Sequence, residues 1–387
     1  MTDAVIVDAI RTPGGKRNGK LKDWHPVDLA AHVLKALQDR NDLDPALVDD
    51  VVMGCVMQVG QQSLNIGRNA VLAAGWPESV PATTVDRQCG SSQQALHFAA
   101  QGVIAGAYDV VVAAGVEVMT RTPMGSSVVK ELGFPFPKTM FDRYAESGLP
   151  PQGIGAEMIA DEYGLTREQL DAFGAESQQR AARATNEGRF DNEIVPVPID
   201  VDGVSEMMTR DEGIREGTTV ETLANLKPAF KEDGKITAGN SSQITDGASA
   251  VLIMSAEKAE ALGLRPRARF HSFAVAGTDP VTMLKGPIPA TTKIMQRSGL
   301  SLDEIDLFEV NEAFASVVLA WQKEHGTDLA KTNVNGGAIA LGHPLGSSGT
   351  KLMSTLLNEL ERTGGRYGLQ TMCEGGGLAN ATIIERV

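Results

Sequence analysis

The chain repeats one pattern of residues in its two halves, and this repeat restricts the fold more than any other feature. The two segments are CGSSQQALHFAAQGVIAGAYDVVVAAGVE from Cys89 and LGSSGTKLMSTLLNELERTGGRYGLQTMCEGG from Leu345. Each reads Gly-Ser-Ser, then about four turns of helix, a glycine-containing turn, a tyrosine and an apolar strand. The repeat predicts two similar halves, in which equivalent loops bring Cys89, His343 and Cys373 to face one another.

Strand and helix patterns alternate along the chain. DAVIVDAIRTP reads as a strand that runs into a turn, and HPVDLAAHVLKALQDRN has apolar residues at the spacing of an amphipathic helix. AYDVVVAAGVEVM is a continuous apolar strand, which is typical of a strand buried on both faces of a sheet. The alternation predicts an α/β protein.

A change of texture divides the chain into three parts. From residue 120 to 243 prolines crowd together and the helical stretches are polar, as in TREQLDAFGAESQQRAARATNEG. We interpret this segment as an inserted loop domain that carries substrate contacts. The expected parts are an N-terminal half of residues 1–119 and 244–262, the loop domain 120–243, and a C-terminal half 263–387.

Charge, cysteine usage and hydropathy exclude several classes of protein. The net charge is −14, which argues against nucleic acid or an anionic membrane as a partner but leaves room for a phosphate-bearing ligand. The three cysteines form neither a disulfide framework nor a metal-binding spacing, so no metal is expected. No apolar run approaches the ~18 residues of a membrane span, and we expect a cytoplasmic protein.

Four residues suggest a chemical function when they are taken together. Cys89 precedes a helix, where the dipole favours a thiolate, although a plain core cysteine is the alternative. His343 lies in a loop that contains several Gly and Pro residues; the alternative is a histidine that only fills space in the core or on the surface. Cys373 lies at a strand end before three glycines. Asn311 stands at a strand-to-helix junction, where the alternative role is a helix N-cap. Two thiols, a base and backbone donors suit acyl transfer through a thioester.

The sequence resembles the thiolase family over essentially its whole length. The matching stretches are IRTPGGK, CGSSQQA, TAGNSSQITDGA, VNEAFA, GGAIALGHPLGSSG and CEGGG, in that order. The resemblance implies two duplicated βαβαβαββ halves in five layers, with an inserted loop domain over the substrate.

The resemblance also implies a role for each of the candidate residues. Cys89 is the nucleophile that takes the acyl group, His343 is the base that activates it, and Cys373 moves a proton at the α-carbon of acetyl-CoA. Asn311, through a water molecule, and His343 hold one thioester oxygen. The backbone N–H groups of Cys89 and Gly375 hold the other.

Coenzyme A is the co-substrate that the resemblance implies, with no permanently bound cofactor. Ser242, Arg215 and Thr222 match positions that contact coenzyme A in the family. The family also implies a homodimer or a homotetramer.

Two departures from the family's biosynthetic members bear on the substrate. Biosynthetic thiolases tend to have an apolar residue where this chain has Glu374, and a His-Met-Gly triplet where it has Pro151-Gln152-Gly153. The pattern is closer to degradative 3-ketoacyl-CoA thiolases. KRNG, PPQGIGAEMIA and MCEGGGLANATIIERV also resemble actinobacterial thiolases of sterol side-chain or long-chain breakdown.

Three other functions compete with this one. A biosynthetic acetoacetyl-CoA thiolase is the alternative within the family. A decarboxylating ketoacyl synthase would use one cysteine and two histidines, whereas Cys373 occupies the second position here. A non-catalytic acyl-CoA-binding or lipid-binding protein on the same fold would be expected to have lost Cys89 or His343.

Overall fold

The computed structural model describes residues 3–387, and the strands of the first half form one side of its sheet. Their order is β4-β3-β5-β8-β1. β3 runs parallel to β4 and β5, whereas β8 runs antiparallel to β5 and β1. The bounds are Ala4–Arg11 for β1, Asp50–Gly54 for β3, Ala82–Val85 for β4, Val110–Val118 for β5 and Thr245–Ser255 for β8; a short β2, Gly15–Lys16, pairs with β8.

The second half repeats this arrangement. Its strands follow the order β10-β11-β12-β9, with β10 and β11 parallel and the other pairs antiparallel. The bounds are Ala268–Gly277 for β9, Leu307–Val310 for β10, Tyr367–Glu374 for β11 and Leu378–Arg386 for β12. The duplication expected from the sequence is therefore confirmed, and a short pairing of β1 with β9 joins the halves into one sheet.

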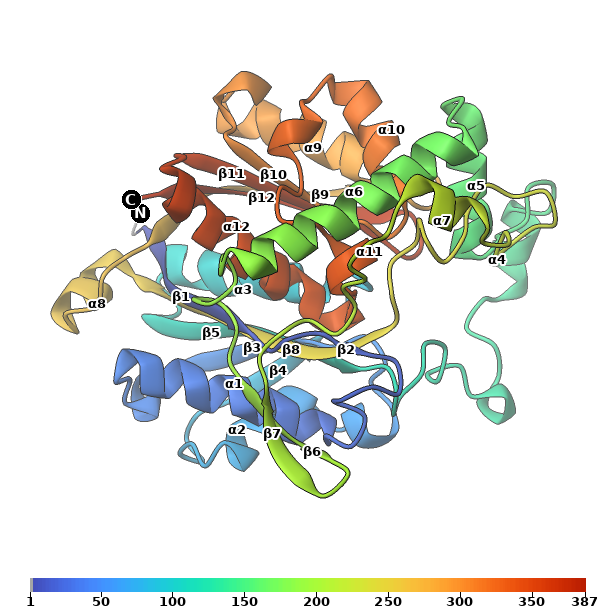
Figure 1. The fold of residues 1–387 in the computed structure, drawn as a ribbon. Coiled ribbons are helices and arrows are strands. Elements are labelled where there is room, and N and C mark those ends of the chain that lie inside the picture. Colours follow the sequence, from blue (N-terminus) through green and yellow to red (C-terminus); the bar gives the residue numbers. More distant parts are fainter. Residues whose placement is uncertain (1–2) are drawn as a thin grey trace.

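Helices separate and cover the two halves, which gives five layers (Figure 1). One outer layer packs on the first half, one central layer lies between the halves, and one outer layer packs on the second half. The first outer layer holds α1 (Pro26–Asn41) and α2 (Ile66–Ala73), and the central layer holds α3 (Ser91–Ile104) and α12 (Ser348–Thr363). The second outer layer holds α9 (Pro287–Ser298) and α10 (Ala315–His325), and α8 (Ala256–Ala261) lies at the edge. The α/β class and the layered arrangement agree with the expectation.

The two central helices, α3 and α12, are in contact near their first turns, and the contact leaves no space for a side chain at Gly349. A Cβ added at Gly349 in α12 would overlap the backbone nitrogen of Gln93 in α3. The Ser92 hydroxyl of α3 accepts a hydrogen bond from the Thr350 N–H at 3.1 Å. This contact holds the loops before the two helices side by side, and those loops carry Cys89 and His343.

Gly349→Ala should lower the free energy of unfolding by about 1–3 kcal/mol, the usual cost of overpacking a close contact. Helix propensity alone favours alanine by about 1 kcal/mol, so a loss would show that the helix contact outweighs propensity. Urea unfolding checks this. Gly277→Ala is the control, because a Cβ there meets no atom within 4 Å; equal stability of both variants would contradict the tight contact.

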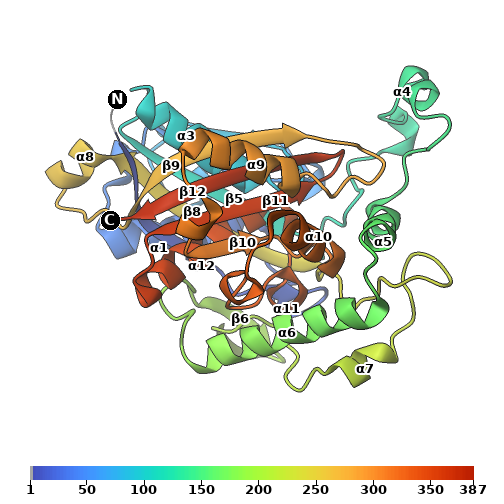
Figure 2. The same ribbon diagram turned by 90° about the horizontal axis from the view of Figure 1, so that it is seen from above.

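Residues 120–243 form an extension that lies largely outside the layers (Figure 2). Its elements are α4 (Lys138–Arg143), α5 (Gln152–Glu162), α6 (Arg167–Asn186), the hairpin β6 (Val197–Val201) and β7 (Val204–Met208), and α7 (Val220–Ala224). Arg11, at the end of β1, anchors the extension: its buried guanidinium pairs with Glu193 at 2.6 Å and Asp211 at 2.7 Å. No helix among residues 3–387 is both long and apolar enough to cross a membrane.

Candidate active site

Cys89 sits on a sharp bend between β4 and α3. The preceding residue, Gln88, has a φ of +48°, a left-handed conformation that is uncommon for a residue with a side chain. Helix α3 begins at Ser91 with Gly90 as its N-cap, so Cys89 lies immediately before the cap. The bend buries the thiol to 6 % exposure, in an apolar cluster that includes Leu345 and Met372.

Cys373 and Gly375 approach Cys89 from the end of β11. Cys373 is fully buried, and its charge would act on that of Cys89. The backbone N–H groups of Cys89 itself and of Gly375 are directed at the Cys89 sulfur. The two cysteines and two backbone donors thus converge on one point.

His343 lies in the loop between α11 (Ala338–Leu341) and α12. Its backbone N–H donates to the Thr245 hydroxyl at 3.0 Å and to the Gln243 carbonyl at 3.1 Å, which fixes the loop. Ser348 donates its only proton to the Pro344 carbonyl at 2.9 Å, so it accepts from His343 Nδ1 at 2.5 Å. Nε2 therefore keeps its lone pair and can accept a proton.

Asn311 follows β10 directly and faces that lone pair. Its backbone N–H donates to the Thr371 carbonyl of β11 at 3.0 Å, and its Nδ2 lies 3.4 Å from His343 Nε2. The amide orientation is the one that offers a donor to the ring nitrogen. Asn311 is not a helix cap, because α10 begins at Ala315 with Phe314 as its N-cap.

Burial dominates the pKa values of the three titratable residues at the site. It lowers the pKa of His343 to about 3, with a contribution from the Lys351 charge, so the imidazole is neutral at physiological pH. It raises the pKa of the Cys89 thiol to about 12 and that of Cys373 well above its usual range. The expectation of a resting Cys89 thiolate is therefore wrong: desolvation outweighs the helix dipole and the backbone donors.

In the resting site Cys89, His343 and Cys373 are all uncharged, and charges form only when protons move during the reaction. Cys89 holds a thiol, and His343 holds a neutral ring whose free nitrogen accepts a proton. Cys373 remains a thiol that can supply one. Such a site suits a nucleophile activated by a neighbouring base, with a separate acid available for the leaving carbon.

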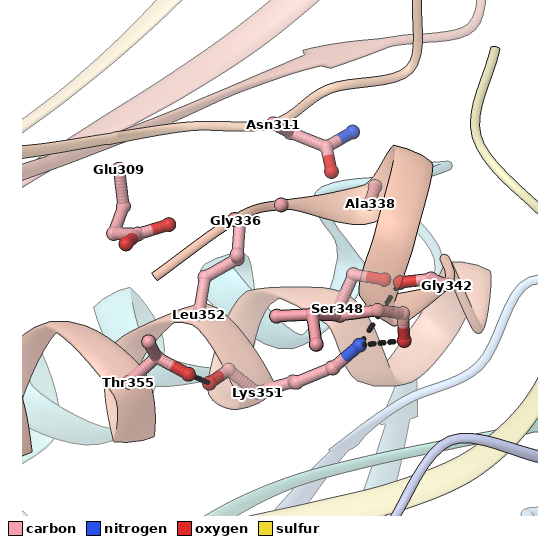
Figure 3. A pocket seen from close by; sticks show the side chains of 11 residues that line it. Glu309, Asn311, Gly336, Ala338, Gly342, Ser348, Lys351, Leu352 and Thr355 are labelled. Atoms are coloured by element: carbon pink, nitrogen blue, oxygen red, sulfur yellow. Dashed lines mark hydrogen bonds between the residues drawn. The ribbon is translucent and has the colours of Figure 1, made fainter. Parts of the chain in front are cut away.

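A small cavity lies beside Asn311 and Gly342, the residue before His343 (Figure 3). Asn311 and the buried Glu309 line one side of it, and Lys351 lines the other. The Lys351 ammonium donates to the carbonyls of Leu341 and Gly342 at 2.6 and 2.9 Å. Lys351 thus pins the turn that leads into His343, while burial lowers its own pKa to about 8.

Ser348→Ala should lower the rate of acyl transfer by about 10- to 100-fold, the usual effect of losing a residue that orients a functional histidine. Without the hydroxyl, the His343 ring loses the partner that keeps the proton on Nδ1. Single-turnover acylation measures this rate. Ser354→Ala is the control, because among the described residues that α12 hydroxyl bonds only the Thr350 carbonyl of its own helix; equal rates in both variants would contradict the role of Ser348.

The three positions expected to contact coenzyme A lie around the 120–243 extension. Arg215 is exposed beside a surface hollow that it lines with Gln178 and Asn186. Thr222 belongs to α7, where its hydroxyl oxygen accepts a hydrogen bond from the Thr219 N–H at 3.0 Å as part of a capping box. Ser242 donates its backbone N–H to the carbonyl of Ala313 at 2.9 Å, and Ala313 is two residues after Asn311 in the chain.

Sequence reasoning missed two residues of the site. Gln152, at the start of α5, points its side-chain amide toward the Cys89 sulfur. The only signal was its place in a triplet that departs from the family. Ser348 was noticed as part of a Gly-Ser-Ser repeat but not as the partner of His343. No group of metal-binding side chains occurs among residues 3–387.

Comparisons with known protein families and curated proteins agree with this geometry. The family described as "Thiolase, N-terminal domain" matches residues 4–257, and "Thiolase, C-terminal domain" matches residues 264–386. A steroid 3-ketoacyl-CoA thiolase of Mycobacterium tuberculosis, FadA6, is 51% identical over 100% of this chain and 95% of its own length. A 3-ketoacyl-CoA thiolase of Aliivibrio fischeri is 48% identical over the whole of both chains.

Solved structures are similar over the same extent. The acetyl-CoA acetyltransferase of Bacillus anthracis superposes with a TM-score of 0.92 at 39% identity, covering 100% of this chain and 99% of that one. Human mitochondrial 3-ketoacyl-CoA thiolase superposes with a TM-score of 0.91 at 37% identity, with the same coverage of both chains.

Proposed function

Because this chain belongs to the thiolase family, we propose that it cleaves 3-ketoacyl-CoA with coenzyme A, releasing acetyl-CoA and a shortened acyl-CoA. The protein is an acyltransferase, and the reverse direction is a Claisen condensation. One observation supports the proposal: His343 is neutral with a free Nε2 beside Asn311, and Leu345 of the same loop packs in one cluster with Cys89, which Cys373 and two backbone donors approach.

Acylation begins with proton transfer from the Cys89 thiol to His343 Nε2. The new thiolate attacks the 3-keto carbon of the substrate. The keto oxygen becomes an oxyanion, which accepts hydrogen bonds either from the backbone N–H groups or from Asn311 and the new imidazolium. The bond between C2 and C3 then breaks. The departing acetyl-CoA enolate takes a proton from Cys373, which leaves an acyl-Cys89 thioester and a Cys373 thiolate.

Deacylation restores the starting protonation states. The Cys373 thiolate takes the proton of an incoming coenzyme A thiol, and the resulting thiolate attacks the acyl carbon of acyl-Cys89. Cys89 leaves as a thiolate and recovers its proton from the His343 imidazolium. A thiolate suits both halves of the cycle, because it is a good nucleophile and a good leaving group.

The substrate is proposed to be a sterol-derived or long-chain 3-ketoacyl-CoA in the β-oxidation direction. Gln152 and Glu374 stand where biosynthetic members have other residues, and a steroid thiolase is 51% identical over the full chain. Thiolysis rates with acetoacetyl-CoA, a long-chain 3-ketoacyl-CoA and a ring-bearing 3-ketoacyl-CoA test this. A kcat/KM that is highest for acetoacetyl-CoA would instead indicate the biosynthetic function.

The extension of residues 120–243 is proposed as the loop domain that binds coenzyme A through Arg215, Thr222 and Ser242. Residues 1–119 and 244–262 make the N-terminal half and 263–387 the C-terminal half. The return of β8 to a place between β5 and β1 supports this division. The exposed guanidinium of Arg215 is available for a phosphate despite the acidic net charge.

Arg215→Ala should raise KM for coenzyme A by about tenfold with little change in kcat. Losing one charge-assisted contact that is equal in ground and transition states has this signature. Steady-state thiolysis at varied coenzyme A measures both constants. Arg265→Ala, another exposed arginine, is the control. An unchanged KM would remove Arg215 from the coenzyme A site.

The protein is proposed to work in the cytoplasm as a homodimer or homotetramer, with coenzyme A thioesters as its ligands and without nucleic acid or membrane partners. Three free cysteines suit a reducing compartment. The extension leaves Leu132, Phe134 and Phe141 at 86, 62 and 48 % exposure, an apolar surface that association between copies would cover. Light scattering during size-exclusion chromatography measures the oligomeric mass.

A further inference from the structure

Glu374 is a buried carboxyl group beside both cysteines for which the proposed reaction has no role. It ends β11 directly after Cys373 and is fully buried. A Cβ added at Gly90 would overlap its Oε1, so the carboxyl lies against the backbone of the residue that follows Cys89. A negative charge on Glu374 raises the pKa of both Cys89 and Cys373.

Neither oxygen of Glu374 receives a hydrogen bond from any part of the chain between residues 3 and 387. Two other buried carboxyl groups, those of Glu117 and Glu312, are well supplied with donors. Glu117 accepts from the backbone N–H groups of Val56 and Gly346 at 2.9 Å and from the side chain of Gln62 at 2.6 Å. Glu312 accepts from the Ser177 hydroxyl at 2.6 Å. An ionised carboxylate without donors is expensive to bury, so the surroundings of Glu374 suit a neutral acid.

Asn380 of β12 offers the acceptor that such an acid needs. Its Nδ2 donates to the Gly90 carbonyl at 3.0 Å and lies 2.8 Å from the Cβ position that Glu374 also overlaps. Its Oδ1 is buried and accepts no hydrogen bond within the described chain. The Glu374 carboxyl and the Asn380 amide thus lie against the same residue, Gly90, and each keeps a buried acceptor atom without a donor in the described chain.

Two charged groups act on Glu374 in opposite directions. Arg87, in the connection from β4 to α3, favours the carboxylate, and Asp86 beside it opposes the carboxylate. The two cysteines complete the titratable surroundings on the sides of α3 and β11. Burial decides the outcome and raises the pKa of Glu374 to about 8.

We propose that Glu374 is a positioning residue that acts as a neutral carboxylic acid. It donates its proton toward the Asn380 amide oxygen, holds the turn after Cys373 against Gly90, and keeps negative charge away from both sulfurs. When it ionises, its charge opposes the Cys89 thiolate that attacks the substrate. The inference goes beyond thiolysis itself and relies on the proposed function only for the identity of the two cysteines.

The test compares alkylation of Cys89 by iodoacetamide in wild-type protein and in Glu374→Gln, with mass spectrometry to assign the site. At and below neutral pH the two proteins should react at the same rate. Above the pKa of Glu374, the variant should react about tenfold faster, because one nearby like charge shifts a pKa by about one unit or more. Glu385→Gln, at the opposite end of β12, should follow the wild type at every pH.

Infrared spectroscopy of the same proteins reads the proton directly. At neutral pH the wild type should show a protonated carboxyl band that is absent from Glu374→Gln. The proposal is overturned if that band is missing, or if wild type and variant share one pH dependence. Glu374→Met is the second neutral variant; if neither neutral variant folds, the carboxylate form is required and the proposal is also wrong. Neither measurement needs turnover, so both stand apart from any failure of the thiolase function.

Discussion

Replacing His343 with glutamine should leave the fold intact and lower the rate of Cys89 acylation by about 10²–10⁴-fold, the usual contribution of a general base. The Cys89 thiol has a pKa of about 12 in the free protein, so a thiolate forms only if a neighbour accepts its proton. Glutamine preserves a polar side chain but offers no such acceptor. Rapid-quench acylation by an acyl-CoA measures the loss.

The same account predicts the pH dependence of the wild type. His343 has a pKa of about 3 instead of 6.5, so acylation should not fall as pH drops through 6.5. A His→Gln variant with a near-normal rate would mean that another group removes the proton. An acidic limb centred at the ordinary histidine pKa would show instead that the ring is more solvated than its buried position implies.

Replacing Cys373 with alanine should divide the reaction into its two chemical parts. Cys89 should still be acylated by a simple acyl-CoA, because that step uses only Cys89, His343 and the oxyanion donors. Exchange of the α-protons of acetyl-CoA and completion of condensation should fall by about 10²–10⁴-fold, because the acid at the leaving carbon is gone. Deuterium incorporation and product formation measure these two steps.

Cys55→Ala is the matched control for Cys373→Ala. Cys55 is as deeply buried, but its sulfur lies near Glu117 and Gln62 and outside the site. Its variant should acylate, exchange protons and condense at wild-type rates. Unimpaired proton exchange in Cys373→Ala would assign the acid to another residue, whereas blocked acylation would show that Cys373 acts earlier than proposed.

The duplication of the fold was within reach of the sequence, because the repeated segment records it. The second segment with Gly-Ser-Ser became α12, the first became α3, and both lie in the central layer as equivalents. Residues 120–243 were recognised as different because their prolines and polar helices lack the buried-strand pattern. The pairing of β1 with β9 was not foreseen, since it depends on how two complete halves meet.

At the site, residue types could be predicted and their electrostatics could not. Cys89 was placed correctly at a helix start, yet its pKa depends on how much protein covers it, and that follows from the packing of Leu345 and Met372 from the other half. The tautomer of His343 likewise depends on Ser348, five residues away in sequence and within 2.5 Å in space. Long-range packing and hydrogen-bond direction leave no local sequence signal.

The identity of the acylated cysteine tests the central claim most directly. Wild-type protein is mixed with a 3-ketoacyl-CoA or an acyl-CoA, quenched in acid and digested, and the peptides are weighed. The acyl mass should lie only on the peptide that contains Cys89, and Cys89→Ala should show neither adduct nor turnover. An acyl group on the Cys373 peptide, or an adduct that persists in Cys89→Ala, would contradict the assignment of Cys89 as the nucleophile.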